Sequence, residues 1–325
     1  MRKEAFAAPV ADEAATRTGR VSSRLTIARG GLLVVVGAFA LLTPGFLSVP
    51  SLTTLLTTAS FVGCLAMAMT FITISGNIMS FALGGTAAVA AVVFVHVLNA
   101  FGYAPAVIAA LVAGALVTAA QGALVGALRA NPIIVSIAAN VLIYGVAEWL
   151  TNNETAHISE EALGLLIKGK LFGLPVEFCA FVLVTIIGQL VLTFTVFGRN
   201  LFYIGSGFRA AEAVGLPTVR TTIGAYCWAG LFSAVAGILL ASRFNQANME
   251  FALRYDYDAI AAVLVGGTAI QGGSGSMMRT FVGVAAISII QVVLLLHGLR
   301  EEWRLLIMGL VVLAVVILYS SRQRG

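Results

Sequence analysis

The chain has 325 residues, of which 60% are hydrophobic and only 10% are charged. A soluble domain is about 25% charged and about 45–50% apolar, so this composition excludes a soluble enzyme, a disordered chain and a single-span anchor. The net charge of +5 does not indicate a nucleic-acid partner, because in a membrane protein the positions of the cations are informative rather than their sum.

The chain begins with a polar segment, residues 1–29, that mixes Lys and Arg with Asp and Glu. It is too polar for the apolar core of a cleavable signal peptide. We interpret it as a cytoplasmic N-terminal tail. Residues 321–325 are interpreted in the same way, as a cytoplasmic C-terminal tail.

Between the tails, residues 30–320 form the predicted transmembrane domain, an all-α, polytopic helical bundle. Its apolar residues suffice for about ten spans of roughly 20 residues each. The ten apolar runs fall near residues 30–47, 51–74, 78–98, 104–128, 132–150, 178–197, 221–242, 258–272, 278–297 and 303–319. Ten spans place both termini in the cytoplasm, and 13 of the 19 Lys and Arg residues then lie inside, as the positive-inside rule requires.

Two connections are longer than a hairpin. The outer stretch 151–177 is polar and acidic. The inner stretch 198–220 is basic and contains a patch of helix formers followed by Gly215 and Pro217, a helix stop signal. We expect a short helix at the cytoplasmic surface there, with an ordinary basic loop as the alternative.

Two segments combine apolar residues with interrupting glycines. Residues 258–276 read DAIAAVLVGGTAIQGGSGS, and the stretch SGNIMSFALGG at 75–85 has a similar character. Each glycine costs a helix about 1 kcal/mol relative to alanine, so we predict a broken eighth span. Broken spans in both halves of a chain are typical of a transport pathway. Glycine-mediated helix packing is the alternative.

The sequence contains no motif for ATP hydrolysis or for catalysis by this chain alone. The glycine-rich stretch lacks the Lys-Ser/Thr of a phosphate-binding loop, and no constellation of nucleophile and base is visible. The three cysteines lie far apart, which favours buried thiols over a metal site or a disulfide framework. We therefore expect no enzyme activity, no cofactor and no metal.

Ionisable residues in spans usually mark function, and the apolar runs are nearly free of them, so an ion-coupled relay is not indicated. Neutral polar side chains remain, and amides and hydroxyls can bind a hydroxylated solute. The same groups also stabilise helix–helix contacts. We assign the solute pathway to side chains in or beside the glycine-interrupted segments and the fifth run, namely Asn77, Ser80, Asn140, Thr268 and Gln271.

The stretch DAIAAVLVGGTAIQGGSGS resembles the permease subunits of bacterial ABC importers for ribose, xylose, arabinose and related sugars. Upstream, FGRNLFYIGSGFRAAEAVGL resembles the family pattern GRxxYAxGGNxxAAxxxGI. NPIIVSIAANVLIYGV and FLSVPSLTTLLTTAS resemble further family segments in the same order, so the resemblance runs from about residue 46 to 320. One departure is Ile78, which stands where the family carries an acidic residue, with Asn77 as the nearest polar substitute.

The resemblance implies that this chain is the permease subunit of a binding-protein-dependent importer that moves a monosaccharide by alternating access. Stretch 198–220 would be the coupling loop on a cytosolic ATP-binding cassette subunit, which binds the ATP. Its contact residues would be Arg209, Ala210, Ala211, Glu212 and Gly215. A periplasmic or lipoprotein solute-binding protein and a second permease subunit, identical or not, would complete the assembly in the bacterial inner membrane.

Three alternatives remain open at this point. The same architecture serves a nucleoside, a furanosyl signal molecule or a polyol. A stand-alone secondary transporter is disfavoured because no intramembrane acid or base is available to couple an ion. A purely structural membrane subunit is disfavoured by the broken eighth span.

Overall fold

The computed structural model describes residues 36–77, 79–152, 154–164, 169–171, 173–252 and 254–320. The predicted tails and Ile78 lie outside these residues, as does part of the first apolar run. Within the described residues, seven helices are long and apolar enough to cross a membrane. They are α2 (Val49–Ile74), α3 (Leu83–Phe101), α4 (Tyr103–Leu128), α5 (Pro132–Thr151), α7 (Val176–Phe194), α10 (Thr218–Phe244) and α12 (Met277–Leu296).

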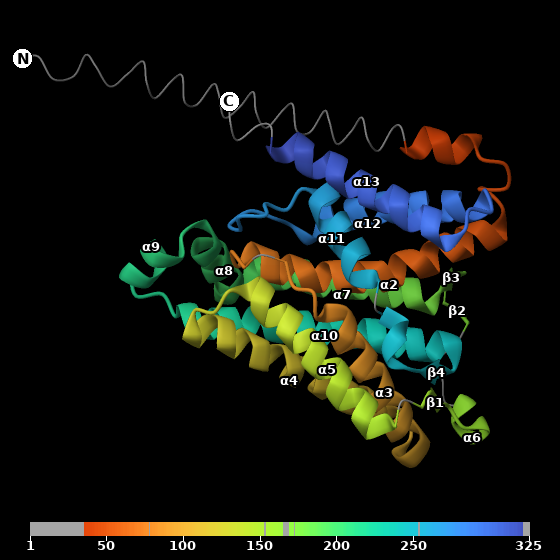
Figure 1. Ribbon diagram of the computed structural model, residues 1–325, viewed down its shortest axis with the longest axis horizontal. Helices are drawn as coiled ribbons and strands as arrows, with labels where there is room; N and C mark the ends of the chain where they lie inside the picture. The colour runs from red at the N-terminus through yellow and green to blue at the C-terminus, as the bar shows by residue number, and fades with distance from the viewer. Residues whose placement is uncertain are drawn as a thin grey trace, which may run out of the picture.

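The remaining elements are short or peripheral. They are β1 (Ala156–His157), α6 (Glu160–Leu163), β2 (Lys170–Leu171), β3 (Leu174–Pro175), α8 (Val196–Ser206), α9 (Phe208–Ala213), β4 (Gln246–Ala247), a 3-10 helix (Met249–Ala252), α11 (Tyr255–Gly266) and α13 (Glu301–Ser320). The antiparallel pairs are β1 with β4 and β2 with β3. The strands and α6 lie at one end of the bundle, whereas α8 and α9 lie at the other (Figure 1).

Local sequence signals fix several helix ends. The Ser48 hydroxyl accepts the backbone N–H of Ser51 at the start of α2, and the Asn131 side chain accepts that of Ile133 at the start of α5. Both helices carry proline in the first turn, where its missing N–H costs nothing. α5 and α10 end at Asn152 and Asn245 in the left-handed conformation, which Asn tolerates better than most residues.

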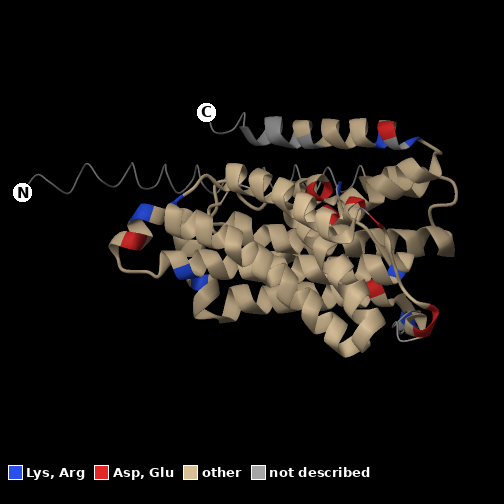
Figure 2. Ribbon diagram, turned by 60° about the horizontal axis from the view of Figure 1, so that its bottom comes forward, with Lys and Arg blue, Asp and Glu red and all other residues tan. Residues whose placement is uncertain are grey.

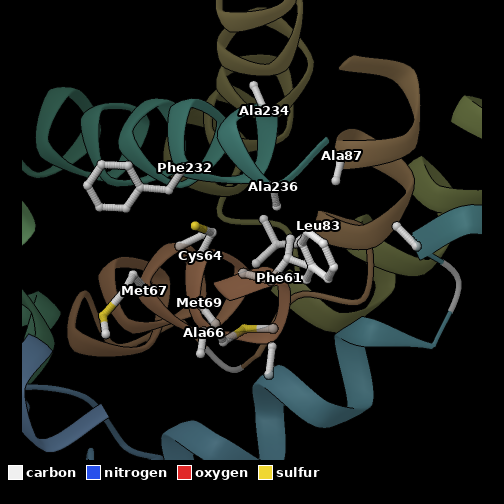
Figure 3. Close-up of a cluster of buried hydrophobic side chains, with 14 of the residues drawn as sticks. Phe61, Cys64, Ala66, Met67, Met69, Leu83, Ala87, Phe232, Ala234 and Ala236 are labelled. Atoms are coloured by element: carbon white, nitrogen blue, oxygen red, sulfur yellow. The ribbon is translucent and has the colours of Figure 1, made fainter. Parts of the chain in front are cut away.

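The core of the bundle is formed by α2, α3 and α10. In α2, 83% of the apolar window is buried, against 22–28% in α4, α5 and α7. Side chains of α2, α3 and α10 meet in a dry cluster of Phe, Met, Leu and Ala around the fully buried Cys64 (Figure 3). All three thiols are free, and the predicted burial holds for Cys64, whereas Cys179 and Cys227 are only half-buried.

Small residues bring α4 against α10. A Cβ on Gly114 would lie 2.7 Å from the carbonyl oxygen of Gly230, and one on Gly122 would lie 2.7 Å from the Cβ of Tyr226. Such close backbone approach is how helices associate in lipid, where apolar burial supplies no driving force. Glycine packing, the alternative weighed for the interrupted segments, therefore operates here between two continuous helices.

The predicted all-α polytopic bundle is confirmed in its coarse form. The described residues contain seven candidate spans, fewer than the ten apolar runs. The eighth run differs because α11 has only 12 residues and stops at Gly267. Charged residues gather mainly near the two ends of the bundle, with a further acidic group at the start of α11 (Figure 2), as expected for a chain whose middle lies in hydrocarbon.

Candidate functional site

The helical bundle is interrupted at two places. The first interruption, residues 75–82, separates α2 from α3, and the second interruption, residues 267–276, separates α11 from α12. Residues 196 positions apart meet there, because a Cβ on Gly272 would overlap the Cα of Gly76. The backbone N–H of Gly273 also donates to the carbonyl oxygen of Ile74 at 2.9 Å.

A third segment, the end of α8, enters the same contact. A Cβ on Gly205 would overlap the carbonyl oxygen of Ile74 and the backbone nitrogen of Gly273. Gly76 and Gly273 have φ values of +83° and +69°, a region in which only glycine is unstrained. We call this contact of Ile74–Gly76, Gly205 and Gly272–Gly273 the backbone crossing.

The first turn of α3 is held by a side chain from the other half of the chain. Asp256 of α11 is 4% exposed, and its Oδ1 accepts the backbone N–H of Gly84 at 2.8 Å. Ala82 at the start of α3 supplies no side-chain cap of its own. Asp256 therefore does for α3 what an N-cap residue does, and it also places a carboxylate at the positive end of the helix.

Two polar side chains of α5 face this same turn. Asn140 and Tyr144 lie one helical turn apart, and a Cβ on Gly85 would lie 2.5 Å from the Asn140 Oδ1 and 3.4 Å from the Tyr144 ring. The Asn140 Oδ1 and the Tyr144 hydroxyl are buried without a hydrogen-bond partner in the described structure. An unpaired buried polar atom costs about 1–3 kcal/mol, so these two atoms carry an energetic cost that the described side chains do not offset.

The other predicted pathway residues lie beside the two interruptions. Thr268 is 1% exposed with its hydroxyl unpartnered, whereas Gln271 is exposed. Asn77 is half-buried and donates to the Ser75 hydroxyl at 2.8 Å. Ser80 is buried, and its hydroxyl accepts the N–H of Ala82 at 3.3 Å.

The predicted pathway residues thus fall into two groups. Asn77, Thr268 and Gln271 lie next to the backbone crossing, while Asn140 faces the start of α3. Ser80 lies between the two groups along the chain. The structure brings all five to the interruptions and to the α5 face beside them.

The residues assigned to coupling lie at the end of the bundle that carries α9. Arg209, Ala210 and Glu212 are exposed on this helix, Ala211 is buried, and Gly215 follows with a φ of +79°. Arg129 at the end of α4 pairs with Glu212 at 2.6 Å, and its guanidinium lies 5.4 Å from the centre of the Phe208 ring.

Sequence reasoning missed Asp256 and Gly205 as structural links. Asp256 and Asp258 both lie in the first turn of α11, which is buried on nearly every face, so helical periodicity does not separate the two acids. Tyr144 is a further residue of the α5 face that the sequence did not single out. Its position one turn from Asn140 was the available signal, since such pairs share a helix face.

Comparisons with known proteins give a consistent result. Residues 51–316 match the family model described as the branched-chain amino acid transport system / permease component. The ribose import permease protein RbsC of Bacillus subtilis (strain 168) is 30% identical over 296 residues, which cover 90% of this chain and 92% of that protein.

Two relatives from Escherichia coli (strain K12) are similarly close. The probable ABC transporter permease protein YphD is 32% identical over 294 residues, 88% of each chain. The L-arabinose transport system permease protein AraH is 30% identical over 205 residues, 63% of this chain and 62% of that protein.

Proposed function

This chain belongs to the family of the branched-chain amino acid transport system / permease component, and on that premise we propose that it is the permease subunit of a binding-protein-dependent ABC importer for a monosaccharide. Its family and its apolar helices make it a multi-pass protein of the bacterial inner membrane. The relatives named for ribose and L-arabinose support the solute class.

The observation that carries the proposal is the meeting of two non-helical segments where α2 and α8 end. Lipid cannot satisfy free backbone groups, so irregular backbone at membrane depth occurs only where it is enclosed by protein or lines a cavity. Here segments from the two halves of the chain meet through Gly76 and Gly272. Interrupted spans at such an interface are the usual place of a solute pathway.

The same geometry supports the finer topology. We propose that α11 and the second interruption together form a broken eighth span in a domain of about ten spans, residues 30–320, with both termini in the cytoplasm. The 12 residues of α11 rise only about 18 Å, too little for a bilayer core of about 30 Å. The loop after Gly267 would complete the crossing.

In this proposal the solute passes weak, neutral contacts. The unpartnered Asn140 Oδ1, Tyr144 hydroxyl and Thr268 hydroxyl would bond sugar hydroxyl groups, with Asn77, Ser80 and Gln271 along the same route. Selection among solutes would belong mainly to a periplasmic or lipoprotein binding protein.

Coupling would run from α9 to the backbone crossing. A cytosolic ATP-binding cassette subunit would dock on α9 and Gly215 and would bind and hydrolyse the ATP. Only Gly207 separates α9 from α8, and α8 ends beside Ile74 and Gly273 at Gly205. A displacement of α9 would therefore reach both interruptions at once and open the pathway to one side at a time, in a pair of permease subunits.

The first experiment is purification of the chain in mild detergent from its native membrane, followed by mass spectrometry of what accompanies it. Recovery of an ATPase with a phosphate-binding loop and of a secreted binding protein would support the importer. A chain that is recovered alone and transports in liposomes without ATP would contradict it.

A charge reversal tests the coupling residues directly. Glu212→Arg and Gly215→Pro are each expected to abolish ATP-driven uptake, while the amount of folded chain in the membrane stays unchanged. The pair of Arg129 and Glu212 is 60% and 47% exposed, and such surface pairs contribute only about 0.2–1 kcal/mol to stability. Glu160→Arg in α6, at the opposite end, is the matched control. Uptake that survives both Glu212→Arg and Gly215→Pro would refute the coupling assignment.

A further inference from the structure

A cavity of about 710 Å³ opens between α4 and α7, outside the crossing and the α5 face. α4 packs along α10, and α7 packs along α2, so α4 and α7 flank a groove whose floor is built from α2 and α10. The volume falls within the range of about 300–1,000 Å³ that is typical of ligand sites. No role in the proposed transport uses this groove.

The deeper part of the groove is apolar. Its walls are Val107 and Leu111 of α4 and Leu183 of α7, and its floor includes Ile238 and Leu239 of α10. Leu183 is 57% exposed, so the groove is open at its side and not enclosed. A flexible hydrocarbon chain fits such a surface, because each buried CH₂ group contributes about 0.8 kcal/mol.

The outer part of the groove carries charge. Lys170 of β2, Glu177 in the first turn of α7 and Arg243 in the last turn of α10 line it together. Strand β2, the start of α7 and the end of α10 lie at the end of the bundle that bears the strands (Figure 1). The salt bridges found among the described residues involve none of Lys170, Glu177 and Arg243, and these are the three charged side chains of the described residues that line the cavity.

We propose that this groove binds a phospholipid of the surrounding leaflet, specifically phosphatidylethanolamine. The phosphate would lie between Lys170 and Arg243, the primary ammonium would donate to the Glu177 carboxylate, and one acyl chain would follow the apolar walls. Two cations and one anion at an apolar groove complement a zwitterionic headgroup above a chain. Phosphatidylglycerol would leave the Glu177 carboxylate without a cation, and the quaternary ammonium of phosphatidylcholine has no N–H to donate.

The proposal is tested by the lipid that stays with the purified chain. The protein is reconstituted in nanodiscs with equal parts of phosphatidylethanolamine and phosphatidylglycerol, extracted in mild detergent, and the retained lipid is quantified by mass spectrometry. We expect the wild type to retain phosphatidylethanolamine above its share of the mixture. Lys170→Gln and Arg243→Gln are each expected to lower this retention about fivefold, the contribution of one cation near a lipid headgroup.

Two further variants separate the parts of the site. Glu177→Gln is expected to keep the total retained lipid but to shift it toward phosphatidylglycerol. Leu239→Trp fills the groove and is expected to lower retention of both lipids. Arg220→Gln, which removes an exposed cation at the opposite end of the bundle, is the matched control and is expected to leave the retained lipid unchanged.

The source of the headgroup chemistry is resolved by competition. Glycerophosphoethanolamine, which has the headgroup without acyl chains, is expected not to displace the lipid at equal concentration. Displacement by it would show a site for a free phosphate compound and would overturn the proposal. Equal retention by the wild type and by the Lys170→Gln, Arg243→Gln double variant would also overturn it. The readout is retained lipid, so its failure leaves the proposed transport function untouched.

Discussion

The two interruptions break their helices by different physical means. At the first interruption, the hydrogen bonds are made by side chains. The Asn77 amide donates to the Ser75 hydroxyl, and the Asp256 carboxylate accepts the backbone N–H of Gly84 in the first turn of α3. In the second interruption, the backbone holds itself, because the N–H of Ala269 donates to the carbonyl oxygen of Ser274 at 2.9 Å and Gly273 donates to Ile74. Beyond Gly76, the first interruption therefore presents replaceable polar groups, whereas the backbone crossing leaves no room for a side chain at Gly205 or Gly272.

This difference predicts that the backbone crossing is the less tolerant region, and Gly205→Ala should have the largest effect. The new Cβ would overlap two backbone atoms, which cannot turn aside as a side chain can. Overpacking usually costs about 1–3 kcal/mol and occasionally more, so we expect a large loss of folded protein in detergent, measured by thermal unfolding with size-exclusion detection.

The matched control is Gly145→Ala in α5, where a Cβ would meet open space. Alanine is favoured over glycine in a helix by about 0.5–1 kcal/mol, so this variant should be as stable as the wild type or more so. Equal behaviour of the two variants would contradict the crossing as the tighter region.

The next largest effect is expected for Asp256→Ala. It would leave the N–H of Gly84, buried at the start of α3, without its acceptor, at a cost of about 1–3 kcal/mol. Asp256→Asn keeps an oxygen that can accept and should recover most of the stability. Thermal unfolding of the three proteins checks the order; an Asn variant as unstable as the Ala variant would show that the charge, and not the hydrogen bond, holds α3.

Asn140→Ala and Tyr144→Phe sharpen the comparison in another way. The Asn140 Oδ1 and the Tyr144 hydroxyl are buried without a partner in the described structure, so their removal should leave stability unchanged or raise it. Each atom would still bond the passing solute, and loss of one such bond, worth about 0.5–1.5 kcal/mol, should lower uptake by up to about tenfold. Uptake assayed beside thermal unfolding separates the two effects; a loss of stability with normal uptake would assign these side chains to helix packing.

The smallest effect is expected for Asn77→Ala in the first interruption. It removes one half-buried donor to the Ser75 hydroxyl, and a single hydrogen bond contributes only about 0.5–1.5 kcal/mol. Folding should persist, with a modest shift in the midpoint of thermal unfolding. A loss of stability as large as that of Gly205→Ala would remove the distinction between the first interruption and the backbone crossing.

Much of this architecture is predictable from residue patterns. Apolar runs place the helices, and the glycines of 258–276 place the second interruption, because both signals are local. Asp256 was not predictable as the link to α3, because Asp258 is the same residue type in the same helical turn. Only the hydrogen bond from Gly84 of α3 distinguishes the two. The role of Gly205 was not predictable either, since one glycine near a helix end indicates the end of the helix as readily as a close backbone contact.

The hydrogen bond between Asp256 and Gly84 joins residues 172 positions apart, and this separation has a consequence for folding during translation. Ribosomes add about 5–20 residues per second, so α3 waits roughly 10–30 s for the carboxylate that completes its first turn. During that interval its leading amide groups have to find another acceptor, such as water or the translocation machinery. The start of α3 therefore keeps a backbone N–H group without its native acceptor until α11 has been synthesised.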